Sequence, residues 1–229
     1  MAPKDRGEEC GRTPVWAREK QQRRPALSRD AILDEAMRIA DTEGLGAVSI
    51  RRVAANLGVR PMSLYTYIDR KEDLFDLMRD NACRAMLLGD ALPGGWREAL
   101  GAIARRTRQV MLHHSWMADI TVYNSSVGPN SLRHVEESIR AVAELDAGPR
   151  ETVEILTAVD KFVLGHVIFE LGSHSGLAEQ SYVRTILASG EFPELARLAG
   201  GAVSGAAGGD DFERQLGWLL DGIEANFTR

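Results

Sequence analysis

VAANLGVRPMSLYTYIDRK, residues 53 to 71, decides the fold. Its apolar residues have the spacing of two short helices, which Gly58 and Pro61 interrupt. Glycine adopts the left-handed conformation without steric cost, and proline is tolerated in the first turn of a helix. Val59 and Leu64 are placed to fill the joint between the two helices. The stretch therefore predicts a helix, a tight turn and a second helix.

The side chains left outside this joint are hydroxyl groups, aromatic rings, a thioether and a cation. They are Arg60, Met62, Ser63, Tyr65, Thr66 and Tyr67. Such groups can reach base edges, thymine methyl groups and phosphates when a helix lies in the major groove of DNA. The alternative is a surface corner between helices, with the tyrosines as packing residues. The helix-breaking Gly58, the apolar joint and the exposed polar side chains all occur within this one short stretch. The pattern therefore favours DNA binding.

Helical periodicity continues along the rest of the chain and predicts an all-α protein. The first helix is expected to begin after Ser28 and to end at Gly44. The second helix of the opening stretch, which would be the DNA-recognition helix, is expected to cover 61–68. Asp69 is then expected to cap a helix over 71–88. Beyond Pro93 the predicted helices cover 96–115, 117–124, 130–145, 150–174, 178–188 and 211–227. No stretch has the alternating pattern of a strand.

Charge and composition divide the chain into parts. Residues 1–27 are polar and aperiodic, and we expect a flexible basic arm there. The glycine-rich stretch at 199–209 has the composition of a flexible loop, and we expect one there. The arm could enter the minor groove beside the recognition helix, or it could remain a solvated tail that raises non-specific attraction to DNA.

Several classes of protein are disfavoured by the sequence. No apolar run is long enough to span a bilayer, and the first residues lack the apolar core of a secretory signal, so a cytoplasmic, nucleoid-associated protein is expected. GSHSG at 172–176 places His174, not serine, at the centre of a nucleophile-like motif, so no catalytic residue is assigned. His113 and His114 are adjacent and should diverge by about 100° on a helix, so no metal site is expected.

Residues 28–75 resemble the DNA-binding domain of the tetracycline-repressor (TetR) family of transcriptional regulators. The resemblance runs through LSRDAILDEAMRIADTEGLGAVSIRRVAANLGVRPMSLYTYIDRKEDLFDLM. AVDKFVLGHVIFEL and FERQLGWLLDGIEANF are similar, more weakly, to the regulatory domain of the same family. The resemblance implies a homodimer whose two recognition helices enter successive major grooves of a palindromic operator, about 34–36 Å apart. It further implies a helix-turn-helix DNA-binding domain over 28–75 and an all-helical ligand-binding and dimerisation domain over 76–229. The protein would be a repressor that a small-molecule inducer releases from DNA.

The resemblance assigns roles to individual residues of the expected DNA-binding domain. The expected DNA contacts are Arg51, Pro61, Met62, Ser63, Tyr65, Thr66, Tyr67 and Lys71. Tyr65, Tyr67 and Lys71 would hold phosphates, and Arg51 would reach a base or a phosphate. The others would meet base edges and thymine methyl groups.

The resemblance further implies a ligand cavity and a four-helix dimer interface in the C-terminal domain. The candidate ligand contacts are Leu87, Ile103, Thr107, Arg133, Glu137, Thr157 and Asp160. Leu87 stands where the founding member has histidine and Ile103 where it has asparagine, so an apolar or aromatic inducer is expected in place of tetracycline–magnesium, and no cofactor. The interface would use 150–174 and 211–227, although the same apolar residues could instead bury a core within the protomer.

Overall fold

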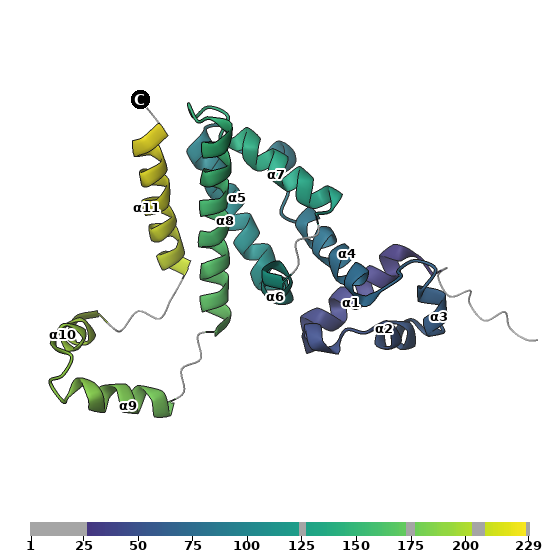
Figure 1. Cartoon of the computed structure of the whole chain (residues 1–229), viewed down its shortest axis with the longest axis horizontal. Helices are drawn as coiled ribbons and strands as arrows, with labels where there is room; N and C mark the ends of the chain where they lie inside the picture. Colours follow the sequence, from purple (N-terminus) through teal and green to yellow (C-terminus); the bar gives the residue numbers. More distant parts are fainter. Residues whose placement is uncertain (1–26, 124–126, 173–176, 203–208, 228–229) are drawn as a thin grey trace, which may run out of the picture.

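The computed structural model describes residues 27–123, 127–172, 177–202 and 209–227. Its packed helices form a smaller head, residues 27–75, and a larger body, residues 76–123, 127–172 and 209–227 (Figure 1). The helices are α1 (Arg29–Glu43), α2 (Ile50–Leu57), α3 (Pro61–Leu64), α4 (Lys71–Arg84), α5 (Trp96–His113), α6 (Trp116–Tyr123), α7 (Pro129–Ala141), α8 (Pro149–Gly172), α9 (Leu177–Leu187), α10 (Pro193–Ala202) and α11 (Gly209–Phe227). Two short 3-10 turns lie at Leu45–Ala47 and Gly89–Ala91. The described ranges contain no strand, so the all-α prediction is confirmed.

The ends of α1 follow from local chemistry. The hydroxyl of Ser28 accepts a hydrogen bond from the N–H of Ala31 at 3.1 Å, which satisfies one of the free donors of the first turn. Gly44 ends the helix with a φ of 82°, and its own N–H donates to the carbonyl of Ala40. Both expected ends of this helix are therefore confirmed.

The turn between α2 and α3 depends on Gly58, which has a φ of 68° and a ψ of 31°. The N–H of the next residue, Val59, donates back to the carbonyl of Ala54 at 2.9 Å. Ala54 and Leu64 are fully buried where the two helices meet, and Val59 packs against the same core. The geometry of the predicted helix-turn-helix is thus present.

Three predicted boundaries around this motif are wrong. α3 ends at Leu64, not at 68, and turn residues follow it. The hydroxyl of Thr66 donates to the carbonyl of Ser63 at 2.8 Å and so competes with the helical bonds of the backbone. Asp69 does not cap α4, because the carboxylate of Asp73 reaches back to the N–H of Arg70 at 3.0 Å. α4 stops at Arg84, well before 88.

The body is built around α5, which packs against α7 and α8 (Figure 1). α4 leaves the head and packs against α7, so it belongs to both parts. Ion pairs fix the outer helices: Arg108 binds Glu170 of α8 at 2.6 Å, and Arg105 binds Glu213 of α11 at 2.8 Å.

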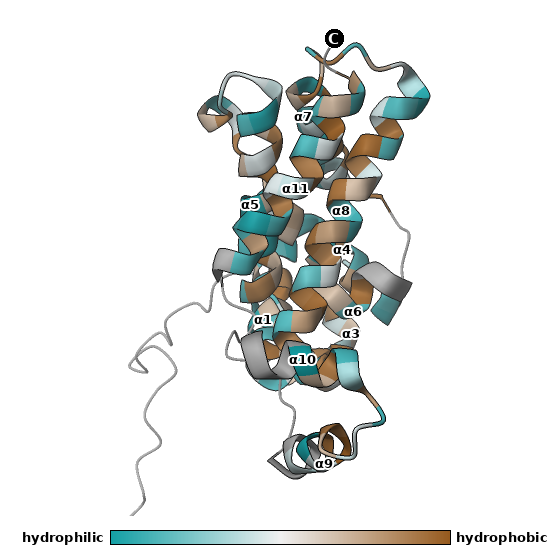
Figure 2. Cartoon of the chain, turned by 90° about the vertical axis from the view of Figure 1, so that its left-hand side faces the viewer, coloured by the Kyte–Doolittle hydropathy of each residue, from teal (hydrophilic) through white to brown (hydrophobic). Residues whose placement is uncertain are grey.

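The outer faces of α8 and α11 carry apolar residues, which Figure 2 shows alternating with hydrophilic ones along both helices. Val163 and Leu216 are buried within the protomer, whereas Trp218 keeps 62% of its surface exposed and Ile168 is also exposed. The apolar residues of these two helices are therefore divided between the core of the protomer and its surface.

α9 and α10 stand away from the packed helices of the body (Figure 1). α10 is an unexpected helix, and it covers part of the loop predicted at 199–209; residues 203–208 lie outside the described residues, as do 1–26 of the predicted arm. Within the described ranges, no helix is both long and apolar enough to cross a bilayer.

Candidate DNA-binding and ligand-binding sites

α2 and α3 lie on the side of the head that faces away from the body (Figure 1), and the residues expected to read bases belong to these helices and to the turn after α3. Met62 is 73% exposed, and Pro61, Thr66 and Arg51 are exposed as well. Ser63 is partly buried. The arrangement leaves the tip of α3 free to enter a groove, which is how recognition helices place their first residues on base edges.

The three expected phosphate contacts differ in their surroundings. Tyr65 is 45% exposed. The hydroxyl of Tyr67 donates to the backbone carbonyl of Leu27 at 2.8 Å, and the ring is partly buried. The ammonium group of Lys71 lies 4.9 Å from the centroid of the Phe75 ring. Tyr65 and Lys71 are therefore free to reach a phosphate, whereas the hydrogen of Tyr67 is already used within the chain.

The body contains a cavity of about 270 Å³ between α4, α5, α6, α7 and α8. Most of its wall is apolar, and three methionines contribute to it. The lining residues are Arg79, Cys83, Met86, Thr107, Met111, Met117, Ser131, His134, Val135, Thr157, Asp160, Lys161 and Leu164.

Three polar atoms of this wall are buried without a hydrogen-bond partner among the described residues. They are Nε of Arg79, Oγ1 of Thr107 and Nδ1 of His134. Buried polar atoms are nearly always paired in folded proteins, because leaving one unpaired costs about 1 to 3 kcal/mol. Three such atoms around one cavity are what a ligand with its own polar groups would satisfy.

Burial also shifts two titratable groups of the cavity. Desolvation lowers the pKa of His134, although the carboxylates of Asp160 and Glu137 oppose the shift. Desolvation by neighbouring atoms raises the pKa of the Asp160 carboxyl, while the charge of His134 lowers it. Asp160 as a residue remains solvent-exposed, which limits the size of its shift. Both groups are therefore biased toward their neutral forms.

The structure separates the seven expected ligand contacts into two groups. Thr107, Thr157 and Asp160 line the cavity. The others do not: Leu87, Arg133 and Glu137 border a surface groove beside α7, and Ile103 is buried in a small apolar cluster. Arg79 of α4 and His134 of α7 also line the cavity, although neither was among the expected ligand contacts. The spacing of Arg79, Cys83 and Met86 along one face of a helix was the available signal.

Glu137 of α7 anchors the segment that follows α4. Its carboxylate is buried and accepts hydrogen bonds from the N–H of Gly89 at 2.7 Å and from the N–H of Leu88 at 3.1 Å. These bonds hold the chain that follows α4 against α7. They also explain why α4 ends before residue 88.

A second carboxylate, Asp80, fixes α4 to the start of α7. It accepts from the N–H groups of Asn130 at 2.9 Å and Ser131 at 3.0 Å, in the first turn of α7. A carboxylate is stabilised there by the free donors and the positive end of the helix dipole. A Cβ at Gly128 would overlap the Asp80 carboxyl group, so only glycine fits at that position without rearrangement.

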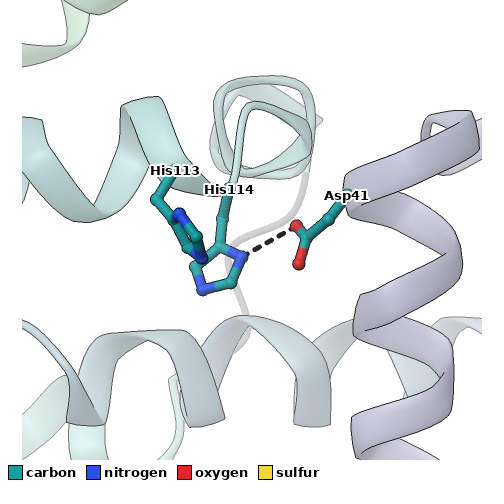
Figure 3. Close-up of side chains that lie close together, drawn as sticks. All are labelled: Asp41, His113 and His114. Carbon is teal, nitrogen blue, oxygen red and sulfur yellow. Dashed lines mark hydrogen bonds and ion pairs between the residues drawn. The ribbon is translucent and has the colours of Figure 1, made fainter.

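The adjacent histidines do not diverge as expected. α5 ends at His113, and His114 leaves the helix with a φ of −111° and a ψ of 69°, so the angular spacing of helical residues does not apply. The centroids of the two imidazole rings are 4.6 Å apart. Nδ1 of His114 lies 2.8 Å from Oδ1 of Asp41 on α1 (Figure 3). Side chains of the head and the body therefore meet at this corner.

A helix-turn-helix head joined by one helix to a cavity-bearing body defines a ligand-responsive DNA-binding regulator. The family described as bacterial regulatory proteins of the tetR family matches residues 32–78, and the tetracyclin repressor-like C-terminal domain matches 88–227. This chain belongs to the TetR family of transcriptional regulators, which are not enzymes.

Individual related proteins support the assignment of this chain to the TetR family. The HTH-type transcriptional repressor DrrR1 of Streptomyces coeruleorubidus is 33% identical over 220 residues, which cover 88% of this chain and 78% of that protein. An HTH-type transcriptional regulator of Saccharopolyspora erythraea is 30% identical, with 92% and 91% covered. Apo ActR from Streptomyces coelicolor has a similar structure, with a TM-score of 0.76, 26% identity and coverage of 87% and 95%. ActR has also been solved in complex with actinorhodin.

Proposed function

We propose that this chain is a homodimeric repressor that binds a palindromic operator and leaves it when a compact aromatic molecule fills the body cavity. The observation that carries this proposal is the set of three partnerless polar atoms around one apolar cavity. We place the DNA-binding domain at 28–75 and the ligand-binding and dimerisation domain at 76–229. The proposed partner, DNA, implies a location in the cytoplasm at the nucleoid.

α4 is the element that can couple the two activities. Its first half packs in the core of the head through Leu74 and Met78, both fully buried. Its second half supplies Arg79 and Cys83 to the cavity wall, and the turn that follows it supplies Met86. A ligand that prefers one position of α4 therefore also selects one position of the head, and the shift can be no larger than that preference.

The cavity wall indicates the chemistry of the ligand. Met86, Met111 and Met117 offer soft, adaptable surfaces that suit aromatic rings. The Nε–H of Arg79 and the hydroxyl of Thr107 can donate to oxygens of the ligand. These features support an aromatic molecule that carries a few carbonyl or phenolic oxygens. The volume of about 270 Å³ lies just below the range of about 300–1,000 Å³ common for ligand pockets, which supports a compact molecule.

The solved complexes of ActR support the same class of ligand. ActR has been crystallised with actinorhodin and with (S)-DNPA. These two compounds are therefore the first probes to use with this chain. A tetracycline–magnesium complex is a less suitable probe, because most of the cavity wall is apolar and it offers a single histidine, His134.

Dimerisation is proposed for the outer faces of α8 and α11. Trp218, Ile168 and Val153 are large apolar residues exposed in the protomer. Exposed apolar patches on soluble proteins commonly mark contacts with other chains. Packing the two helices against the same pair of a second copy would form a four-helix interface and would set the spacing of the two recognition helices.

The test begins with selection of bound duplexes from random DNA by the purified protein, which should yield a palindrome. Fluorescence anisotropy with that palindrome then measures release by actinorhodin and (S)-DNPA. An Arg79→Ala protein, with a shortened side chain in the cavity wall, should bind the palindrome but require more ligand for release. Selection that yields no shared sequence would overturn the DNA-binding part. Equal ligand response of the variant and the native protein would overturn the cavity part.

A further inference from the structure

A cluster of three metal-ligating side chains lies at the corner between the head and the body, and the proposed function does not use it. Asp41 comes from the last turn of α1, His113 from the end of α5, and His114 from the link to α6. One donor atom of each lies within 4.8 Å of the other two (Figure 3). The Asp41 and His114 side chains keep 26% and 12% of their surfaces exposed, so an ion can reach them from solvent.

The separations are close to those that one ion requires. Ligand atoms about 2.0–2.2 Å from a zinc ion lie about 3.0–3.4 Å from each other in octahedral to tetrahedral arrangements. Oδ1 of Asp41 and Nδ1 of His114 are 2.8 Å apart, so they can share an ion with little movement once the proton of their hydrogen bond is released to solvent. His113 is an exposed residue at a helix end, and a ring nitrogen of His113 lies within 4.8 Å of a ligand atom of each of the other two residues, so its side chain would have to move closer to bind the same ion.

Neighbouring groups already orient two of the three ligands. The indole N–H of Trp116 donates to Oδ1 of Asp41 at 2.6 Å and holds the carboxylate toward the histidines. The backbone N–H of His114 donates to the carbonyl of Val110 at 2.9 Å and fixes the end of α5. Metal sites typically have such hydrogen bonds around their ligands, because the bonds set the direction of the ligand atoms before the ion arrives.

We propose that Asp41, His113 and His114 form a binding site for a divalent transition-metal ion of the zinc type, which ties the head to the body. Two imidazoles and one carboxylate suit such ions better than they suit Mg²⁺ or Ca²⁺, which prefer oxygen ligands. The site is separate from the inducer cavity, since none of its three residues lines that cavity. It shares the α5–α6 corner with the cavity residues Met111 and Met117, so an ion would restrain one wall of the cavity.

The experiment uses the full-length dimer without a histidine tag and measures binding of Zn²⁺ by calorimetry. Co²⁺ absorption spectroscopy serves as a second readout, because the visible bands of Co²⁺ report nitrogen and oxygen ligands directly. We expect one ion per protomer at this site and a rise in the thermal midpoint that a chelator reverses. Asp41→Asn and His113→Ala should each weaken Zn²⁺ binding by more than about 100-fold, because loss of an outer-shell partner alone costs about 10- to 100-fold.

Asp34→Asn is the matched control, because Asp34 is an exposed carboxylate on the same helix. It should bind Zn²⁺ as the native protein does. The proposal is overturned if the native protein binds no ion at this site, or if Asp41→Asn and His113→Ala bind as tightly as the control. In that case the cluster is only a hydrogen-bonded contact between head and body. Asp41 and His113 are the residues of choice because both are exposed, so their variants should fold.

Discussion

The hydroxyl of Tyr67 donates a hydrogen bond of 2.8 Å to the backbone carbonyl of Leu27, 40 positions earlier in the chain. Tyr67 follows α3, and Leu27 lies directly before the residue that caps α1. The bond therefore holds the residue before the cap of α1 beside the turn that follows α3. A hydroxyl has one hydrogen to donate, and a phosphate oxygen can only accept, so the residue cannot hold both partners at once.

Tyr67→Phe tests this relationship. The change removes the hydrogen bond and retains the ring, so the free energy of unfolding should fall by about 1 kcal/mol. Tyr65→Phe is the matched control: its exposed hydroxyl contributes little to stability but is free to reach a phosphate. Urea unfolding and anisotropy with duplex DNA measure the two effects. If Tyr67→Phe leaves stability unchanged and weakens DNA binding more than Tyr65→Phe does, the hydroxyl serves the phosphate after all.

Lys71 and Ser63 should separate electrostatic attraction from base recognition. Lys71→Gln removes a cation proposed to hold a phosphate, so it should weaken binding to all duplexes and reduce the slope of log K against log salt by about 0.9 for each phosphate lost. Ser63→Ala should change the preferred base at one position of each half-site, by about 1 to 3 kcal/mol, and leave the salt slope unchanged. Anisotropy at several salt concentrations with matched and altered operators measures both. Equal losses on every duplex for both variants would refute these roles.

Local chemistry made the head predictable. Gly58 is required where φ is positive, Ser28 has the right side chain for a cap, and the apolar spacing fixes which residues meet. All three features act within a few residues. The end of the recognition helix was not predictable in the same way, since it depends on whether the hydroxyl of Thr66 bonds to the backbone or faces solvent.

The body was less predictable because its site is made by tertiary contacts. The cavity is formed by residues of five helices, and its partnerless atoms on Arg79 and His134 become visible only when those helices are packed. α10 was missed because its last turns contain the glycines of a stretch with linker composition. Asp41 and His114 are 73 positions apart in the chain, so no local sequence pattern predicts their contact.

Glu137→Ala should destabilise the body. The change leaves the N–H groups of Leu88 and Gly89 without their charged acceptor, and the expected loss in the free energy of unfolding is about 1.5 to 3 kcal/mol. Glu136→Ala is the control, because that exposed neighbour on the same helix should change stability by less than about 0.5 kcal/mol. Urea unfolding followed by circular dichroism distinguishes them. Similar midpoints for the two variants would contradict the anchoring role of Glu137.

Trp218→Glu should weaken the proposed dimer. A large exposed aromatic residue at the centre of an interface often contributes 2 kcal/mol or more, so the dissociation constant of the dimer should rise by at least about tenfold. Sedimentation over a range of protein concentrations measures the change. Leu132→Glu, an equally exposed apolar residue on α7, should leave the constant unaltered. If both substitutions act alike, or if neither acts, the interface lies elsewhere.

His134 should make stability depend on pH. Burial lowers its pKa below the ordinary value of 6.5, so between the two pKa values the unfolded chain binds more protons than the folded one. Stability contributed by this group is therefore complete above pH 6.5 and is lost as the pH falls through the folded pKa. His134→Gln should remove that part of the dependence, because glutamine does not titrate.

The measurement is the urea midpoint from about pH 5 to about pH 7.5, where histidine is the side chain that ordinarily titrates. A chelator keeps metal ions out of the comparison. Asp160 and Glu137 also face His134, and their charges favour its protonated form, so the difference between the native and His134→Gln profiles reports the net effect. Parallel profiles for these two proteins would show that His134 is solvated in the folded state, and that its Nδ1 pairs with water and is not held for a ligand.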